Sequence, residues 1–425
     1  MARVLISTMP ATGHVNPALP LATELVRRGH EVVWHTGRDY AGKVAATGSR
    51  FAPFRAAPDF EQIPVTADEG AKGMAVGVSL MRRLFIDRLA GQVADYEEIL
   101  KEFPADVVLA DMCSLGADAL HAKGGPVYAT LGINPLVTFD PEIPPFGSHR
   151  PPATTVGQRL RNRVAHQMTR RIFMPAVTRL LNAERVRLGL SPLPDGRQLS
   201  DVLRSPYLHL MPTTEAFEYP RANLEPQIHF VGPLLPAPPA AFTPPAWWAE
   251  LEDRPVVHVT QGTYATDPTS LIRPTVNGLA GEDVLVVATG PGLDRVGPLP
   301  SNVRTGAFIP HAQLLPYVDA MVTNAGYNGV LTALSHGVPL ICAGRSEDKA
   351  NTSARVAWSG SGIDLKTDTP AANDVREAVG TVLATPSYRE NARRIQADFA
   401  RHDPPAEASS LLEQLARDKA LVARG

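Results

Sequence analysis

The feature that most constrains the fold is an alternation of short β-branched runs with helical segments, which occurs in both halves of the chain. Continuous apolar strands separated by helices are typical of parallel sheets covered on both faces. We therefore predict an α/β protein with two doubly wound sheets, whose strand carboxyl ends face each other across a ligand-binding cleft. The predicted strands cover 3–8, 31–36, 105–111 and 126–132, and further strands, each followed by a loop or helix, begin the stretches 255–263, 283–290, 303–310, 320–326 and 338–344.

A proline-rich stretch, 229–248, separates the two halves and has the composition of a semi-rigid linker. The 425 residues also exceed the length at which a single core stops growing. We therefore expect a first domain over 1–230, a linker over 231–250, a second domain over 251–403 and a terminal amphipathic helix within 404–425.

Composition and charge argue against several classes of function. The formal net charge of -2 gives no support to nucleic-acid binding. Cys113 and Cys342 lie far apart in apolar runs, as expected for free thiols in a reducing compartment. No stretch resembles a secretory leader or a spanning helix, so we expect a cytoplasmic protein without stable membrane association. The basic segment 158–190 predicts two surface helices with a solvated arginine face, and docking on a membrane surface is the alternative.

His14 follows the first predicted strand, at the sheet edge where ligands bind. Asn16 is expected to cap the next helix and Pro17 to occupy its first turn, which would leave the imidazole unobstructed. A lone loop histidine is more often structural than catalytic, but Asp111 ends another predicted strand at the same cleft. We therefore predict a histidine base whose tautomer is fixed by Asp111, with Asp118 as the rival partner.

The stretch NAGYNGVLTALSHGVP predicts a strand end, a turn and a helix that begins near Asn328 or Gly329. Free N–H groups at a helix start favour anions, and Gly326 would let a phosphate approach the backbone closely. A second strand end presents Gly262 and Thr263. Structural turn chemistry is an equal alternative for the helix-start turn. The chain has neither a P-loop nor a glycine fingerprint after its first strand, which disfavours a dinucleotide oxidoreductase.

The order of five segments carries a more specific indication: GHVNP, VTQGT, FIPHAQLL, NAGYNGVLTALSHGVPL and SEDKANTSARVAWSG. In this order they resemble the family-one glycosyltransferases of the GT-B fold, and most closely the bacterial branch that glycosylates macrolides, aromatic polyketides and related natural products. The resemblance covers nearly the whole chain. It implies two Rossmann-like domains, of which the first binds the acceptor and the second the nucleotide sugar. His14 and Asp111 match the family's base and its partner.

The resemblance also implies how the nucleotide sugar is held. Phe308 would stack on the pyrimidine, the backbone of Ile309 would read its edge, and His311 stands in the position of a family glutamine. A polar loop residue is the alternative reading of His311. Asp348 takes an acidic position that contacts sugar hydroxyls, and Lys349 replaces a glutamine beside it. A surface salt bridge is the alternative reading of Asp348 and Lys349.

The diphosphate contacts implied by the resemblance are Gly262, Thr263, Asn324, Gly326, Asn328 and Gly329. Asn324 replaces the family's histidine and Gly329 its Ser or Thr. An asparagine amide can donate to a phosphate oxygen but carries no charge, so backbone donors should bear more of the leaving group's charge. Thr332 replaces a ribose-binding glutamate, which favours a thymidine diphosphate (dTDP) sugar over a uridine diphosphate (UDP) sugar as donor.

The implied reaction is a direct displacement with inversion. Neutral His14 would deprotonate an acceptor hydroxyl, amine or indole nitrogen, which attacks the anomeric carbon opposite the diphosphate. General-base help is worth about 10²–10⁴ in rate, and donors around the diphosphate should supply more. No acidic metal motif is convincing, so we expect no metal and no cofactor beyond the donor substrate.

Three points stay open in the sequence. The acceptor is expected to be a small hydrophobic molecule, but its identity and the oligomeric state, monomer or dimer, are not encoded in any motif. A non-catalytic nucleotide-sugar-binding or auxiliary protein is the alternative function. In GT-B relatives the terminal helix packs back on the first domain, and a simple surface helix fits the 404–425 pattern equally well.

Overall fold

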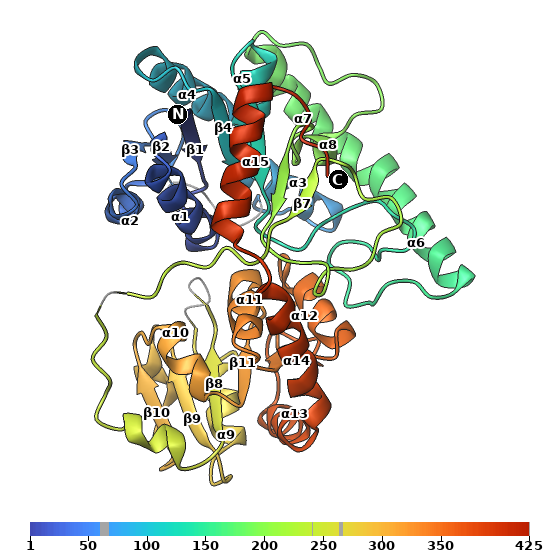
Figure 1. Cartoon of the computed structure of the whole chain (residues 1–425). Coiled ribbons are helices and arrows are strands. Elements are labelled where there is room, and N and C mark those ends of the chain that lie inside the picture. Colours follow the sequence, from blue (N-terminus) through green and yellow to red (C-terminus); the bar gives the residue numbers. More distant parts are fainter. Residues whose placement is uncertain (60–67, 240, 263–266, 425) are drawn as a thin grey trace.

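The computed structural model describes residues 1–59, 68–239, 241–262 and 267–424, which form two lobes (Figure 1). Within these residues, the first lobe contains a parallel sheet with strand order β3-β2-β1-β4-β5-β6-β7, and the second a parallel sheet with order β10-β9-β8-β11-β12-β13. In each sheet the order of the strands reverses at a central pair, β1 with β4 and β8 with β11, and a crevice opens at the carboxyl ends of such a pair. The prediction of an α/β fold with two doubly wound sheets is confirmed.

The strands are β1 (Arg3–Ser7), β2 (Glu31–Thr36), β3 (Arg50–Pro53), β4 (Val107–Asp111), β5 (Val127–Leu131), β6 (His209–Met211), β7 (Ile228–Phe230), β8 (Val256–Thr260), β9 (Leu285–Thr289), β10 (Val303–Gly306), β11 (Ala320–Thr323), β12 (Leu340–Cys342) and β13 (Gly362–Asp364). The helices of the first lobe are α1 (Thr12–Arg27), α2 (Ala41–Ala46), α3 (Met74–Met81), α4 (Leu89–Glu102), α5 (Gly116–Ala122), α6 (Val156–Met168), α7 (Met174–Arg187) and α8 (Leu199–Val202). The remaining helices are α9 (Ile272–Gly278), α10 (His311–Leu314), α11 (Tyr327–Ser335), α12 (Lys349–Trp358), α13 (Ala372–Ala384), α14 (Pro386–Phe399) and α15 (Pro404–Asp418).

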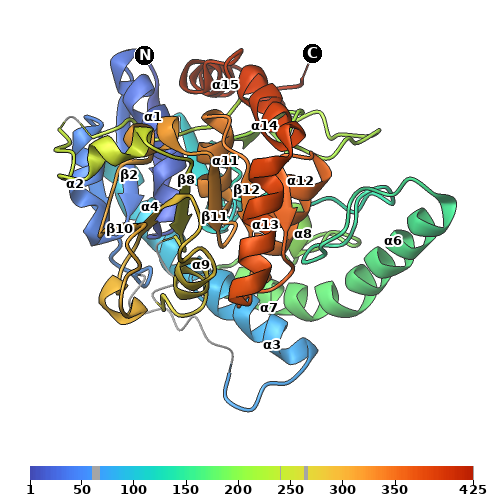
Figure 2. The same cartoon turned by 90° about the horizontal axis from the view of Figure 1, so that it is seen from below.

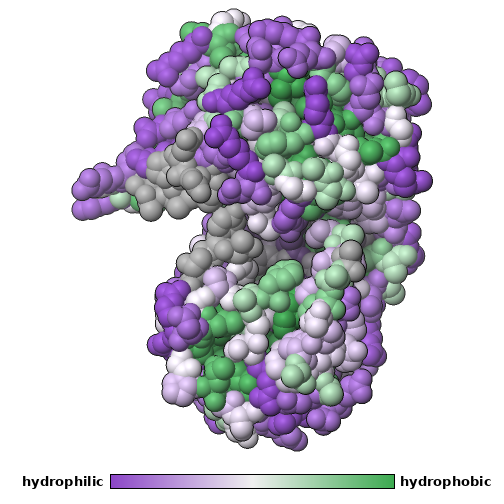
Figure 3. Space-filling view, turned by 90° about the vertical axis from the view of Figure 1, so that its left-hand side faces the viewer, coloured by the Kyte–Doolittle hydropathy of each residue, from purple (hydrophilic) through white to green (hydrophobic). Residues whose placement is uncertain are grey.

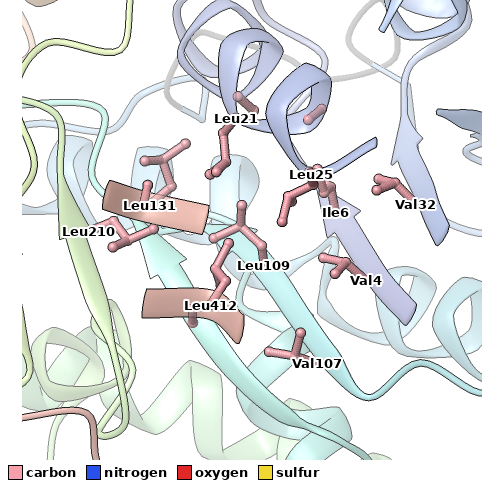
Figure 4. Packing of buried hydrophobic residues seen from close by; sticks show 14 of the residues in the cluster. Val4, Ile6, Leu21, Leu25, Val32, Val107, Leu109, Leu131, Leu210 and Leu412 are labelled. Atoms are coloured by element: carbon pink, nitrogen blue, oxygen red, sulfur yellow. The ribbon is translucent and has the colours of Figure 1, made fainter. Parts of the chain in front are cut away.

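The core of the first lobe explains why its strands are apolar throughout. Ile6 of β1 lies in register with Leu109 of β4, and both are fully buried. Leu21 and Leu25, one turn apart on α1, pack over these strands (Figure 4). Burying such aliphatic side chains contributes about 1.5–3 kcal/mol each. The strand ends that carry the site are therefore supported by a closely packed core.

The terminal helix α15 crosses back to the first lobe. Leu412 is buried in the same cluster as the first sheet (Figure 4). On the surface of this contact, Glu413 accepts a hydrogen bond from His30 at 2.8 Å. After the helix, the main-chain N–H of Val422 donates to the carbonyl of Tyr207 at 2.9 Å. The end of the chain thus ties the second lobe to the first.

The basic segment forms surface helices, as predicted. α6 continues through a π-helical stretch, Thr169–Phe173, into α7, and it projects from the first lobe (Figure 2). Its outer face carries apolar side chains as well as arginines, so the solvated arginine face is only part of what it exposes. Among the described residues, no helix is both long enough and apolar enough to cross a bilayer.

Candidate active site

The site lies where the two sheets meet. The carboxyl ends of β1 and β4 face the lobe that carries β8 and β11 (Figure 1). The space-filling view shows a hollow between the two lobes (Figure 3). The starts of α1 and α11 come together there, because Nδ2 of Asn328 donates to the carbonyl of Gly13 at 2.9 Å. Residues from both halves of the chain can therefore contact one ligand.

His14 and Asp111 form a hydrogen-bonded pair on the first-lobe side of the hollow. Nδ1 of His14 lies 3.1 Å from Oδ2 of Asp111; the carboxylate is buried, and 18% of the histidine side chain is exposed. Main-chain N–H groups of Met9 and Cys113 also donate to this carboxylate. Burial raises the pKa of Asp111, but His14 and these N–H groups outweigh it and hold the pKa below its ordinary value. An ionised Asp111 accepts a hydrogen bond from Nδ1–H of His14, which leaves the lone pair of Nε2 available to accept a proton.

Asp118, the rival partner, is engaged elsewhere. Its Oδ2 lies 2.8 Å from Nη1 of Arg185, and its Oδ1 accepts a hydrogen bond from the hydroxyl of Tyr128. Asp118 belongs to α5, seven residues beyond Asp111 at the end of β4. The structure therefore places Asp111, and not Asp118, against the imidazole.

His14 lies in the first turn of α1 and not in a loop, because the helix begins at Thr12, before the expected Asn-Pro cap. The expected helix start was wrong for a physical reason. Pro17 has no N–H, so the carbonyl of Gly13 four residues earlier loses its partner within the helix. That carbonyl accepts the Asn328 amide from the other lobe instead. The proline thus frees a backbone acceptor that joins the two lobes beside His14.

The turn between β11 and α11 presents a helix N-terminus to the hollow. The first N–H groups of a helix have no partner within it and carry its positive dipole end. The amide of Asn324 donates to the carbonyl of Gln261, which ties the end of β11 to that of β8. One N–H of this amide is therefore taken, and the second remains. A Cβ added at Gly329 would meet open space, so a ligand can approach the backbone there. Gly326 is the N-cap residue.

Of the two further residues that the resemblance assigns to the diphosphate, Gly262 follows β8. Gly262 adopts a positive φ of 73°, which only glycine adopts without strain. Thr263 falls outside the described residues. On the other side, the hydroxyl of Thr332 donates to the carbonyl of Asn328 in its own helix at 2.7 Å. This bond occupies the donor of the Thr332 hydroxyl within α11.

The segment before α10 has the properties expected of a base-binding surface. The ring of Phe308 is 77% exposed, whereas Ile309 is buried in the core of the second lobe. Nε2 of His311 lies 3.4 Å from Nε2 of His258, whose Nδ1 lies 2.9 Å from the carbonyl of Val287. Burial lowers the pKa of His311 to about 4 and that of His258 to about 3, so both rings are neutral at pH 7.

These contacts determine the tautomers of the two rings. The carbonyl of Val287 can only accept, so His258 carries its proton on Nδ1 and accepts at Nε2. His311 must then donate from Nε2, which leaves its Nδ1 as an acceptor. Sequence analysis missed His258, because nothing in a β-branched run shows which strand residue faces α10.

Asp348 and Lys349 stand at the start of α12, on the second-lobe side of the hollow. Burial and the neighbouring Glu347 raise the pKa of Asp348 to about 6, although Lys349 and His14 oppose the shift. Nζ of Lys349 lies 2.8 Å from Oε2 of Glu347, so its charge is paired on the surface. Asp348 is thus close enough to His14 to sense its charge.

One side chain near the His14–Asp111 pair was not foreseen. Arg88, from the segment before α4, is buried and donates to the carbonyl of Pro58 at 3.1 Å. Its guanidinium lies over the ring of Phe54, 5.2 Å from the centroid. Burial lowers the pKa of Arg88, and Asp111 partly restores it. The buried guanidinium of Arg88 therefore lies close enough to Asp111 to interact with its charge.

Within the described ranges, one group of side chains has the spacing of metal ligands. Ligand atoms of His14, Asp111 and Cys113 all lie within 4.8 Å of one another. Burial and Asp111 raise the pKa of the Cys113 thiol well above its usual value, so it stays protonated, whereas metals bind the thiolate. The charge of Arg88 also opposes a dication there. The group fits a metal poorly.

A second unforeseen feature fixes α12 against the first lobe. Arg355 of α12 forms a buried ion pair with Glu218, with Nε 2.7 Å from Oε1. Arg221 lies 3.3 Å from the same carboxylate, and the ring of Tyr219 lies 4.1 Å from the Arg355 guanidinium. Burial raises the pKa of Glu218, but the two arginines hold it below its ordinary value. The helix that begins with Asp348 and Lys349 is thereby locked to the lobe that carries His14.

The chain resembles known proteins in both sequence and structure. Residues 275–415 match the family described as "Erythromycin biosynthesis protein CIII-like, C-terminal domain". The chain is 43% identical over 419 residues to 4'-demethylrebeccamycin synthase of Lentzea aerocolonigenes, covering 97% of this chain and 99% of that protein. It is similar in structure to the calicheamicin glycosyltransferase CalG4, with a TM-score of 0.76, 23% identity and coverage of 98% and 99%. It is also similar to a spinosyn rhamnosyltransferase, SpnG, solved with thymidine diphosphate, with a TM-score of 0.69, 19% identity and coverage of 97% and 100%.

The match to the synthase spans nearly the whole of both chains, well beyond what a shared fold alone would give. This match and the two parallel sheets together place both lobes in one family. The chain belongs to the family-one glycosyltransferases of the GT-B fold, in the bacterial branch that acts on natural products with nucleotide-sugar donors.

Proposed function

We propose that this enzyme transfers a sugar with inversion from a nucleoside diphosphate to a small hydrophobic acceptor, with His14 as general base and Asp111 as its partner. The observation that carries the proposal is the 3.1 Å contact between Nδ1 of His14 and Oδ2 of Asp111 at the hollow between the lobes. It leaves Nε2 of His14 free to accept a proton, and the buried carboxylate stabilises the imidazolium as it forms.

The leaving group is proposed to sit at the start of α11. Main-chain N–H groups and the helix dipole would stabilise the charge that develops on the diphosphate, which is usually the largest contribution to such catalysis. Asn324 and Asn328 each keep one amide N–H for a phosphate oxygen. This arrangement supplies the stabilisation without a metal ion, so we propose a metal-independent reaction. Chelation with EDTA should then leave the rate unchanged.

The acceptor is proposed to lie on the first lobe beside the His14–Asp111 pair. Met9 and Cys113, whose N–H groups hold Asp111, belong to a small apolar cluster with Met112. Partly buried Phe85 packs against the same cluster. An apolar environment next to a base that is 18% exposed suits an aglycone with a single reactive hydroxyl or nitrogen.

The donor is proposed to carry thymidine rather than uridine. The Thr332 hydroxyl is bonded within its own helix, so no carboxylate or free hydroxyl at this position holds both ribose hydroxyls. We expect kcat/KM for a dTDP sugar to be at least equal to that for the matching UDP sugar, because the Thr332 hydroxyl is not free to hold the ribose 2′-hydroxyl. Thr332→Glu should lower the ratio of kcat/KM for the dTDP sugar to kcat/KM for the UDP sugar. A wild-type preference for uridine would contradict the assignment.

The His258–His311 contact predicts a selective effect on donor binding. His258→Phe removes the hydrogen bond that fixes the tautomer of His311. We expect it to raise the KM for the donor about three- to tenfold, with kcat nearly unchanged. In a His311→Gln background, His258→Phe should have no further effect, because an amide needs no partner to present an acceptor. Steady-state kinetics at saturating acceptor measure both. An equal loss in the two backgrounds would show that His258 acts through packing alone.

The proposal is tested by mass spectrometry of reactions that combine dTDP and UDP sugars with a panel of aglycones, with and without EDTA. Transfer with inverted anomeric configuration is expected. Nucleotide binding without transfer to any aglycone would favour the alternative, a nucleotide-sugar-binding auxiliary protein.

A further inference from the structure

Helix α6 exposes an apolar stripe that nothing in the described structure covers. The helix projects from the first lobe in both views (Figure 1, Figure 2). Exposed aliphatic side chains recur every four residues along α6 and the following π-helical turn, and so form one band. They are Val156 (77% exposed), Leu160 (58%), Val164 (51%), Met168 (57%) and Ile172 (53%).

The inner face of the same helix is polar, which reverses the usual pattern of a surface helix. Asn162 and His166 are buried against the preceding loop. Nδ2 of Asn162 donates to the carbonyl of Pro141 at 3.1 Å, and Nε2 of His166 lies 2.9 Å from the carbonyl of Ile143. These bonds fix the rotation of α6. The outward position of the apolar band is therefore built into the fold.

The charge around this band is mostly positive. No aspartate or glutamate occurs from 143 to 183, and seven arginines do, of which Arg159 pairs with Glu142 at 3.4 Å, although the whole chain has a formal charge of -2. Arg161, Arg163 and Arg171 are exposed on the helix that carries the band. A projecting apolar band flanked by arginines has the composition of helices that lie in the surface of an anionic bilayer.

We infer that α6 docks this enzyme reversibly on anionic lipid surfaces, with the band Val156–Ile172 inserted between headgroups and the arginines facing the phosphates. A second copy of the chain fits less well, because pairing α6 with α6 would bring arginines together. A protein groove also fits less well, because the band contains none of the aromatic anchors that dominate such contacts. The inference does not depend on the proposed chemistry.

The test is co-sedimentation of the full-length protein with vesicles of phosphatidylcholine and phosphatidylglycerol (3:1). We expect binding at low salt that weakens as salt increases, and little binding to phosphatidylcholine alone. Absence of binding to the anionic vesicles at low salt would overturn the inference.

Matched variants locate the contact. Leu160→Gln with Val164→Gln should weaken vesicle binding by about tenfold or more. Val186→Gln is the control, since Val186 is equally exposed (57%) but lies on α7 outside the band. Nucleotide binding should be the same in all three proteins, which shows that they are folded. Equal vesicle binding by the double variant and the control, or a dimer in solution that the double variant abolishes, would also overturn the inference.

Discussion

Replacing His14 by alanine should lower kcat by about 10²–10⁴, the range that a general base contributes. Nucleotide affinity should change little, because the pyrimidine and the diphosphate of the nucleotide are proposed to bind on the second lobe. Asp111→Asn should lower kcat in the same way, since the amide cannot hold an imidazolium. Rapid-quench kinetics with saturating donor and acceptor measure the chemical step, and calorimetry measures nucleotide affinity.

The control for this prediction uses the neighbouring histidine, His30, which lies outside the hollow and bonds to Glu413. His30→Ala should leave kcat unchanged. If His14→Ala retained full activity, the base assignment would fall. If it lost nucleotide binding as well as transfer, His14 would be a structural residue of the interface between the lobes.

Replacing Arg355 by methionine should produce the largest loss of stability, about 3–5 kcal/mol, because it leaves the Glu218 carboxylate buried with one partner fewer. Arg221 remains 3.3 Å away, which places the expected loss at the lower end of this range. The exposed Arg376, 4.0 Å from Glu282, is the control, and Arg376→Met should cost less than about 1 kcal/mol. Calorimetric Tm values give the comparison without assuming a single two-state transition.

The same pair predicts a pH dependence. The folded-state pKa of Glu218 lies below its ordinary value, so its contribution to stability is present above the unfolded-state pKa of about 4.3 and is lost as the pH falls through the folded value. In Arg355→Met the carboxyl group is easier to protonate. The difference in Tm between the variant and the wild type should therefore shrink as the pH falls from 7 towards 4. A constant difference would mean that packing, and not charge, causes the loss.

The sequence was sufficient to predict the fold because the signals were periodic and repeated. Apolar runs separated by helices predict parallel sheets wherever the strands pair, and the strand ends of such sheets must share an edge. The placement of His14 and Asp111 at one edge followed from this rule. Asp111 was predicted to meet the imidazole, but Asp118 stayed a rival, because it lies only seven residues beyond Asp111 and sequence does not show the path between them.

The parts that could not be predicted depend on contacts between distant segments. Pro17 looked like a helix start, whereas its missing N–H frees the Gly13 carbonyl for Asn328, 315 positions later. The Glu218–Arg355 pair likewise joins two charges that no local pattern relates. The outward position of the apolar band on α6 could not be predicted either. The polar inner face of α6 bonds to loop carbonyls, and helical periodicity does not show such contacts.

The central claim is that His14 and the start of α11 act on one donor and acceptor across the hollow. A crystal structure with thymidine diphosphate and an acceptor tests it most directly. The account predicts the β-phosphate at the main-chain N–H groups that begin α11, the pyrimidine on Phe308, and an acceptor hydroxyl or nitrogen within hydrogen-bond distance of Nε2 of His14. A diphosphate bound elsewhere, or an acceptor whose reactive atom is separated from Nε2 by protein side chains, would contradict it.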